Sequence, residues 1–150
     1  MKKNNFLVFI LIISLNSCVS TKSTLKNVDN TAVKPAVVDD AFLITEKSTD
    51  GKYGINKDYP INIGFDNENM SSKNIALYFN ALQGENGEKI TFKKTDDCCP
   101  FPTKRSFMGA GLLNVYEVSF EGIDKKINLY FNIYDKGKIL CPKGFMIKKK

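Results

Sequence analysis

The stretch KINLYFNIYD, residues 126–135, alternates aliphatic or phenylalanine side chains with asparagine and tyrosine. Successive side chains of a β-strand point to opposite faces, so this period of two predicts a strand with two chemically different faces. The apolar face carries Ile127, Leu129, Phe131 and Ile133. The opposite face, which is also a candidate binding face, carries Asn128, Tyr130, Asn132 and Tyr134.

Two stretches upstream, residues 112–122 and residues 88–94, show the same alternation. In the first of them, the side chains predicted to share one face are Leu112, Tyr116, Val118 and Phe120. In the second, Ile90 and Phe92 share a face. Because the connection between residues 122 and 126 is short, we expect 112–122 and 126–135 to pair as an antiparallel hairpin.

Weaker strand signals lie on either side of this region. Residues 41–47 predict a short strand, and the turn-rich segment 51–65 predicts another around Ile61 and Ile63. Residues 139–147 contain Pro142, which lacks the N–H that a strand ladder needs. We therefore expect an edge or irregular strand there.

Residues 71–84 predict the one clear helix. Its apolar side chains recur with the spacing of a single helical face, at Ile75, Tyr78, Phe79 and Leu82. The segment opens on serines, which can cap free N–H groups, and Gly84 stands where a glycine often ends a helix. An amphipathic helix has to bury its apolar stripe, so we expect this face to lie in the core.

Together these elements predict an α+β domain over residues 42–150. Its expected architecture is a small antiparallel sheet, a meander of about four or five strands, with one main amphipathic helix packed on it. The hydrophobic fraction of 43% is high enough for a packed core. A chain of 150 residues is expected to hold one such domain rather than two.

The first eighteen residues, MKKNNFLVFILIISLNSC, have the parts of an export signal. Two lysines precede an apolar run over residues 6–15, which is shorter than the roughly 20 residues that a membrane-spanning helix needs. The run ends in Leu15-Asn16-Ser17-Cys18, which resembles the lipobox of bacterial lipoproteins. That resemblance implies removal of residues 1–17 as a signal peptide and lipidation of Cys18.

Residues 18–41 are polar, small and mixed in charge, without a sustained period. We interpret them as a flexible, lipid-anchored tether between the membrane and the domain. An ordinary secretory signal and an uncleaved anchor are the alternatives. Neither of these explains a cysteine placed directly after the apolar run.

The composition argues against several classes of function. The chain has no histidine, which removes the commonest general base and the commonest metal ligand. Its formal net charge is +6, but Arg105 is the only arginine, and direct reading of bases relies on arginine forks. The cysteine spacing is not that of a zinc site. We therefore predict no catalytic residue, no metal, no cofactor and no nucleic-acid partner.

The domain also resembles a family of small lipoproteins from Gram-negative bacteria. The resemblance covers roughly residues 51–147 and rests on the motifs YGINKDYPINIG, YFNALQGENGEKITF, CCPF, LLNVYEVSFEG, LYFNIYDKG and PKGF. It implies a lipid-anchored protein of the cell envelope, and it transfers no activity to individual residues.

Some relatives in that family are labelled 2-dehydro-3-deoxyphosphooctonate aldolase, so the alternative function is this aldolase or another envelope enzyme. The aldolase is a TIM barrel, whose eight βα units need about 250 residues. A chain of 150 residues with one predicted helix is too short for that fold. For another enzyme, Glu117 and Glu121 are the imaginable carboxylate pair of a glycosidase, although a solvated strand face explains them as well.

Three cysteines follow Cys18, namely Cys98, Cys99 and Cys141. Disulfides persist in an envelope compartment. Neighbouring Cα atoms are about 3.8 Å apart, below the usual disulfide range of about 4.4–6.8 Å, and Pro100 favours an extended Cys99. We therefore expect Cys98 or Cys99 to bridge to Cys141, with the other as a buried free thiol. The alternative is that Cys141 is unpaired and the neighbouring pair packs as small apolar groups.

The sequence thus predicts a membrane-anchored envelope lipoprotein with a non-catalytic binding or scaffolding domain. Its expected partners are the membrane, through the lipid, and an envelope protein or glycan. The face carrying Tyr130 and Tyr134 suits sugar or protein contacts, although the solvent side of an antiparallel sheet is the simpler explanation. The domain would lie in the periplasm or at the cell surface, held to the inner or the outer membrane.

Overall fold

The computed structural model describes residues 23–149, so Cys18 and the predicted signal peptide lie outside the described residues. The elements, in chain order, are β1 (Val37–Val38), β2 (Ala41–Phe42), β3 (Ile61–Asn62), the 3₁₀ turn η2 (Glu68–Met70), α1 (Ser71–Asn80), β4 (Leu82–Gly84), β5 (Ile90–Pro102), β6 (Ala110–Phe120), β7 (Ile123–Asn132) and β8 (Phe145–Ile147).

The main sheet has the strand order β3-β7-β6-β5. Its last three strands form an antiparallel meander, in which Val118 of β6 lies opposite Ile127 of β7 and Phe92 of β5. The short strand β3 extends the sheet in parallel, with Ile61 opposite Phe131. The pairs β1-β2 and β4-β8 form two small antiparallel ribbons. The predicted α+β class, a small sheet with one main helix, is therefore confirmed.

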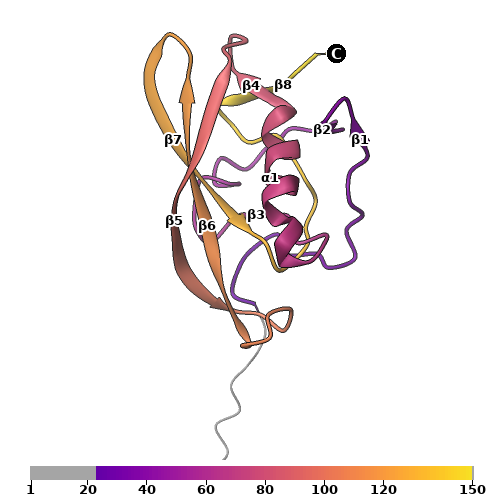
Figure 1. Ribbon diagram of the computed structural model, residues 1–150. Coiled ribbons are helices and arrows are strands. Elements are labelled where there is room, and N and C mark those ends of the chain that lie inside the picture. Colours follow the sequence, from indigo (N-terminus) through magenta and orange to yellow (C-terminus); the bar gives the residue numbers. More distant parts are fainter. Residues whose placement is uncertain (1–22, 150) are drawn as a thin grey trace, which may run out of the picture.

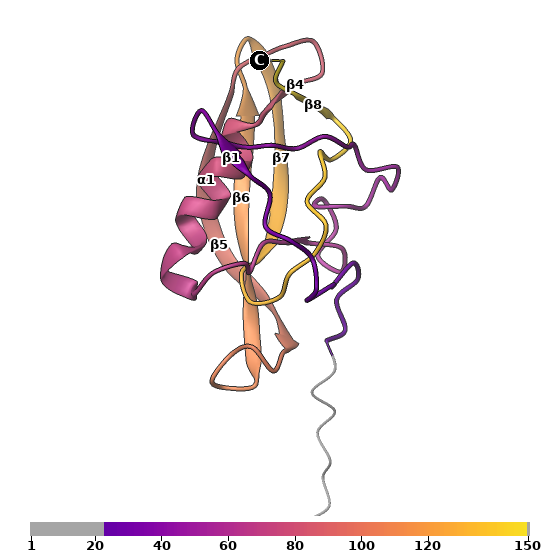
Figure 2. The ribbon, with the colours of Figure 1, turned by 90° about the vertical axis from the view of Figure 1, so that its right-hand side faces the viewer.

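Helix α1 covers one face of the sheet (Figures 1 and 2). The four residues predicted to form its apolar stripe are all buried. Phe79 stacks on Phe92 of β5 with ring centroids 4.1 Å apart, and it meets Phe131 of β7 edge-on at 5.4 Å. Edge-to-face and offset stacking are the favoured arrangements of aromatic rings. The centre of the core is thus aromatic and joins the helix to the middle of the sheet.

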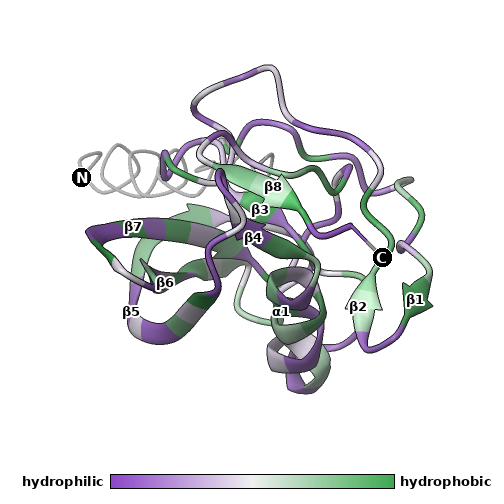
Figure 3. Ribbon diagram, turned by 90° about the horizontal axis from the view of Figure 1, so that it is seen from above, coloured by the Kyte–Doolittle hydropathy of each residue, from purple (hydrophilic) through white to green (hydrophobic). Residues whose placement is uncertain are grey.

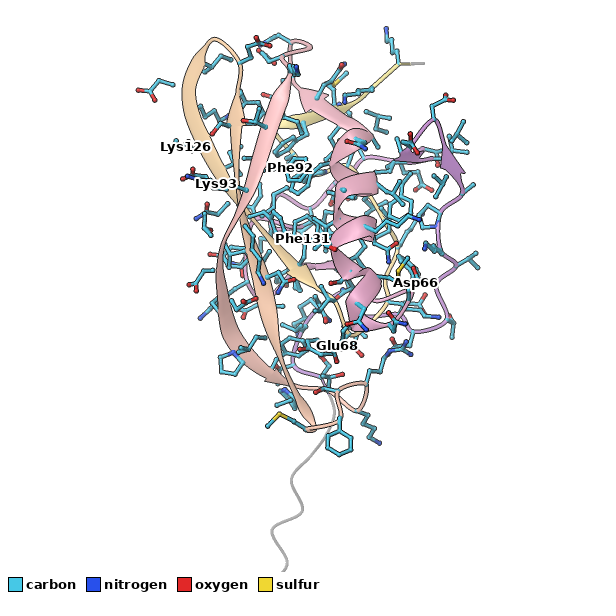
Figure 4. The ribbon with its side chains drawn as sticks, viewed as in Figure 1. Asp66, Glu68, Phe92, Lys93, Lys126 and Phe131 are labelled. Atoms are coloured by element: carbon cyan, nitrogen blue, oxygen red, sulfur yellow. A yellow bond between two sulfur atoms is a disulfide. The ribbon has the colours of Figure 1, made fainter. Side chains whose placement is uncertain are left out.

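The two faces of the meander differ as the alternation predicts, except at the start of β6, where Leu112 is 43% exposed and Leu113 and Val115 are buried. Hydrophobic and hydrophilic bands follow one another along β5, β6 and β7 (Figure 3). Phe92 and Phe131 point into the space between the sheet and α1, whereas Lys93 and Lys126 point away from it (Figure 4). On that outer face both lysines form ion pairs with Glu117, at 3.2 and 3.1 Å.

The ends of the helix differ from the expectation. The residue before α1 is Met70, which makes no side-chain cap, so the serines do not cap the helix. The turn η2 precedes the helix instead. Gly84 is not a helix-ending glycine, because it pairs with Phe145 in the β4-β8 ribbon. The helix ends early since this pairing, completed by the bond from Lys148 N to Ala81 O at 2.9 Å, takes over the backbone.

Strand β5 is much longer than the stretch 88–94 that the alternation predicts, because it continues through the two cysteines to Pro102. Its pairing with β6 is irregular between Lys94 and Asp96 and again between Cys98 and Phe101. Such bulges place unpaired residues inside a strand. Pro100 stands in the second irregularity, where the ladder does not need its missing N–H.

The described part of the expected tether is packed on the domain, which corrects the boundary placed at residue 42. Lys26 N donates to Asp58 O and Asp29 N to Lys136 O, both at 2.8 Å. Further along, residues 37–42 form the β1-β2 hairpin. The polar composition of this segment does not reveal the packing, because the contacts are backbone and polar side-chain hydrogen bonds, which leave no apolar pattern in the sequence.

Within residues 23–149, no helix has the length and apolarity required to cross a bilayer.

Candidate functional site at the tip of the β5-β6 hairpin

The hairpin of β5 and β6 ends in residues 103–109, named here the tip loop, and its apolar tip is fully exposed. The relative exposure of Phe107 is 106% and that of Met108 is 87%. The loop lies at the extreme end of the molecule in two perpendicular views (Figures 1 and 2). Single exposed apolar residues are common, but a large aromatic beside a methionine at a projecting tip points to a contact surface.

Internal hydrogen bonds give the tip loop a defined shape. Thr103 N donates to Gly109 O at 3.1 Å, and Gly109 N donates to Ser106 O at 3.0 Å. Gly109 has φ +72°, a conformation that glycine adopts without the strain other residues meet. These bonds close the loop below Phe107 and Met108, so the two side chains are held outwards.

The base of the tip loop is tied to the end of β7. Thr103 Oγ1 donates to Asp135 Oδ1 at 3.3 Å. Arg105 Nε donates to Tyr134 O at 2.6 Å, and a second guanidinium nitrogen donates to Gly64 O at 3.4 Å. The loop is therefore attached to the sheet and does not hang free from the hairpin.

A buried polar network supports this attachment. Asn132 is 0% exposed, and its Nδ2 donates to Asn62 Oδ1 at 2.9 Å and to Asp135 Oδ2 at 3.2 Å. Its Oδ1 accepts from the backbone N–H groups of Tyr134 and Asp135 at 3.0 and 3.2 Å. Asp135 Oδ1 also accepts from Asn30 Nδ2 at 3.3 Å. One carboxylate thus joins the N-terminal segment, the end of β7 and the tip loop.

A shallow groove lies beside the tip loop, between the loop and the start of α1. It is lined by Phe65, Asp66, Asn67, Glu68, Arg105, Ile133 and Tyr134. Asp66 accepts hydrogen bonds from Lys34 and Asn74, which hold the pKa of its carboxyl below the usual value. The groove therefore mixes charges of both signs, with Asp66 and Glu68 opposite in charge to Arg105.

The cysteines are paired differently from the expectation. Cys98 and Cys99 are bonded to each other, with Cα atoms 3.7 Å apart, and Cys141 is a buried free thiol. The expectation assumed an extended Cys99, but its φ is +60° and the ladder is interrupted there, so the two side chains do not point to opposite faces. Cys141 lies in the main core, and burial raises the pKa of its thiol to about 11.

The candidate binding face is divided by the structure. Asn128 is exposed, and Tyr130 and Tyr134 are half-buried. Asn132 is fully enclosed and hydrogen-bonded, so it cannot contact a ligand. Asn128, Tyr130 and Asn132 lie in β7, whereas Tyr134 lies just beyond its end. Only the tertiary fold shows that the end of this face is covered. The four residues therefore do not act as one surface.

The imagined carboxylate pair is not assembled either. Glu117 lies between Lys126 and Lys93, whose hydrogen bonds lower the pKa of its carboxyl. A glycosidase acid needs the opposite shift. Glu121 lies beyond the end of β6, in the turn to β7.

Peptide mapping tests the cysteine pairing. Trypsin is expected to release residues 95–104 with both sulfurs unreactive towards iodoacetamide until a reductant is added, because they are joined. Cys141 is expected to react only after unfolding, since its thiol is buried and uncharged at neutral pH. A sample reduced before alkylation is the control. Detection of a peptide that joins Cys141 to either neighbour would contradict this pairing.

In the part of the chain that the structure describes, no three His, Cys, Asp or Glu side chains come together to hold a metal ion.

Comparisons of the chain with known protein families, with curated proteins and with solved structures found no match.

The tip loop is the candidate site that the sequence interpretation missed. The segment KRSFMG, residues 104–109, places two cations beside two large apolar residues and a glycine. This signal becomes meaningful only when the segment is known to be a hairpin loop. The sequence analysis ended the strand over residues 88–94 too early, because the side chains around Pro100, where the pairing with β6 is irregular, do not alternate in polarity. The hairpin loop after residue 102 was therefore not recognised.

Proposed function

We propose that the protein is a lipid-anchored domain of the bacterial cell envelope that binds or scaffolds a partner and does not catalyse a reaction. The observation that carries the proposal is the short apolar run that ends in Leu15-Asn16-Ser17-Cys18. A cysteine at that point is the attachment site of a lipoprotein, and several acyl chains on one cysteine suffice for a stable anchor.

The chemistry of the described residues supports a binding role. The buried carboxylate of Asp135 is occupied by three hydrogen-bond donors from side chains, and Glu117 is held by two lysines. Burial leaves the Cys141 thiol uncharged and enclosed. A reactive side chain needs activation and access to substrate, which the enclosed Asp135 and Cys141 lack. The two lysines lower the pKa of the Glu117 carboxyl, which is the opposite of what a general acid needs.

The aldolase alternative receives no support from the fold. A TIM barrel requires eight parallel strands, each followed by a helix. Residues 23–149 contain one α-helix and a meander that is mainly antiparallel.

Mass spectrometry of the N-terminal peptide tests the anchor. In a Gram-negative host, the mature chain is expected to begin at Cys18 with acyl groups attached, and Cys18→Ser is expected to lose the lipid. Cys141→Ser is the matched control, because it makes the same chemical change at a cysteine inside the core and leaves the anchor intact. An unmodified Met1, or a cleaved terminus without lipid, would rule out the proposal.

A further inference from the structure

We propose that the tip loop is a second, non-covalent membrane contact, in which Phe107 and Met108 enter the anionic bilayer that holds the lipid on Cys18. This inference rests on the proposed anchor. It assigns to the domain a fixed orientation, with the β5-β6 hairpin tip facing the lipid.

The first argument is placement. The described chain begins at the end of the molecule where the tip loop lies (Figures 1 and 2). Two hydrogen bonds also place the N-terminal segment near the tip loop. Asp135 Oδ1 accepts one from Asn30 of the N-terminal segment and one from Thr103 at the base of the loop, each at 3.3 Å. Asn30 in the N-terminal segment and Thr103 in the loop are thus bonded to the same carboxylate.

The second argument is the reach of the anchor. Five Cα–Cα steps separate Cys18 from Ser23, and a fully extended chain spans at most about 3.6 Å per residue. Ser23 therefore lies within about 18 Å of the lipidated cysteine, whatever the conformation between them. The residues that follow are bonded to the domain, so they do not lengthen the tether. The end of the domain that carries the tip loop is consequently kept close to the lipid.

The third argument is the chemistry of the tip loop. Phe107 and Met108 are fully exposed, and aromatic rings with long apolar side chains are favoured at the boundary of headgroups and acyl chains. The loop also carries Lys104 and Arg105 and contains no carboxylate. Cations near an anionic leaflet are attracted within a Debye length. The apolar tip and its flanking cations therefore match an anionic lipid surface.

A bilayer fits this surface better than a folded partner does. Phe107 and Met108 form a narrow convex tip, whereas a stable protein interface buries about 800 Å² on each side. Headgroups can part around a projecting loop without a preformed pocket. The internal hydrogen bonds of the loop reduce the ordering cost of insertion.

A single tryptophan reports the contact, because the chain contains none. The full lipidated chain carrying Phe107→Trp is placed in phosphatidylethanolamine–phosphatidylglycerol vesicles. We expect its emission to shift to the blue and to be quenched by brominated acyl chains. The control is Val37→Trp, at a position of β1 that is 49% exposed and lies away from the tip loop, and no quenching is expected there.

A cleavage assay provides an independent measurement. Trypsin should cut the vesicle-bound chain slowly after Lys104 and Arg105, because lipid shields the loop. The double variant Phe107→Ser/Met108→Ser keeps the anchor but loses the apolar tip. We expect its loop to be cut at least about tenfold faster, since burial of two such side chains favours insertion by at least that factor.

The outcomes separate the two proposals. Mass spectrometry on the same sample first establishes whether Cys18 carries lipid. If the chain is lipidated but the tryptophan of the Phe107→Trp variant is not quenched, the tip contact is overturned and the anchor stands, and a protein partner for the tip becomes the better explanation. If Cys18 carries no lipid, the proposed function fails and this inference fails with it.

Discussion

Replacing Phe131 with alanine is expected to lower the free energy of unfolding by about 3–5 kcal/mol. Phe131 is fully buried in the middle of β7 and makes edge-on contacts with Tyr78, Phe79 and Tyr116, at centroid distances of 5.6, 5.4 and 5.5 Å. Its removal costs the transfer energy of the ring and leaves a cavity that three other aromatic rings cannot fill without moving. The loss is a large part of the stability of a typical domain, about 5–15 kcal/mol.

Chemical denaturation followed by circular dichroism measures this effect. Phe107→Ala is the matched control, because it makes the same chemical change at a fully exposed position, and its effect is expected to stay within about 0.5 kcal/mol. If the two variants lose similar stability, the aromatic contacts between α1 and the sheet do not have the importance assigned to them.

Asn132→Ala is expected to lower the free energy of unfolding by about 2–4 kcal/mol, because each buried polar group left without a partner costs about 1–3 kcal/mol. The substitution removes the donor to Asn62 Oδ1 and Asp135 Oδ2. It also removes the acceptor of the N–H groups of Tyr134 and Asp135. Alanine offers none of these bonds, and the site is closed to water.

The comparison with Asn128→Ala makes this prediction specific. Asn128 lies on the same predicted face of the same strand but is exposed, so its replacement should change stability by no more than about 0.5 kcal/mol. The same denaturation experiment serves for both variants. Equal losses would mean that the network around Asp135 contributes no more than a solvated strand face does.

The strand and helix positions that form the core were predictable because each element obeys its own period. Alternation identified β6 and β7 as strands, but it placed Leu112 on the apolar face, and this residue is 43% exposed whereas Leu113 and Val115 are buried. The helical stripe identified Ile75, Tyr78, Phe79 and Leu82, all of which are buried, although Leu82 lies in β4 and not in the helix. Phe92 was placed on the correct face, although it stays 37% exposed at the edge strand. Apolar periodicity predicts burial well, since the hydrophobic effect acts on each element in the same direction.

The candidate site was far less predictable. Phe107 and Met108 belong to no periodic segment, and their role depends on the hairpin that carries them. The disulfide was mispredicted because the backbone at Cys99 leaves the extended region that Pro100 favours. The backbone conformation at Cys99 depends on how β5 pairs with β6, where the ladder is irregular. Rules based on neighbouring residues alone do not take that pairing into account.

The sequence by itself determined the α+β class, the two faces of β7 and the apolar stripe of α1, because the side-chain period is a local property of each element. It also contains the Cys18 motif on which the proposed anchor depends. Only the tertiary structure decided that Asn132 is buried while Asn128 is exposed, that Cys98 bonds to Cys99, and that the N-terminal segment and the tip loop meet at Asp135. These features join residues far apart in the chain or depend on irregular backbone, and they arise from packing between elements rather than from the pattern within one.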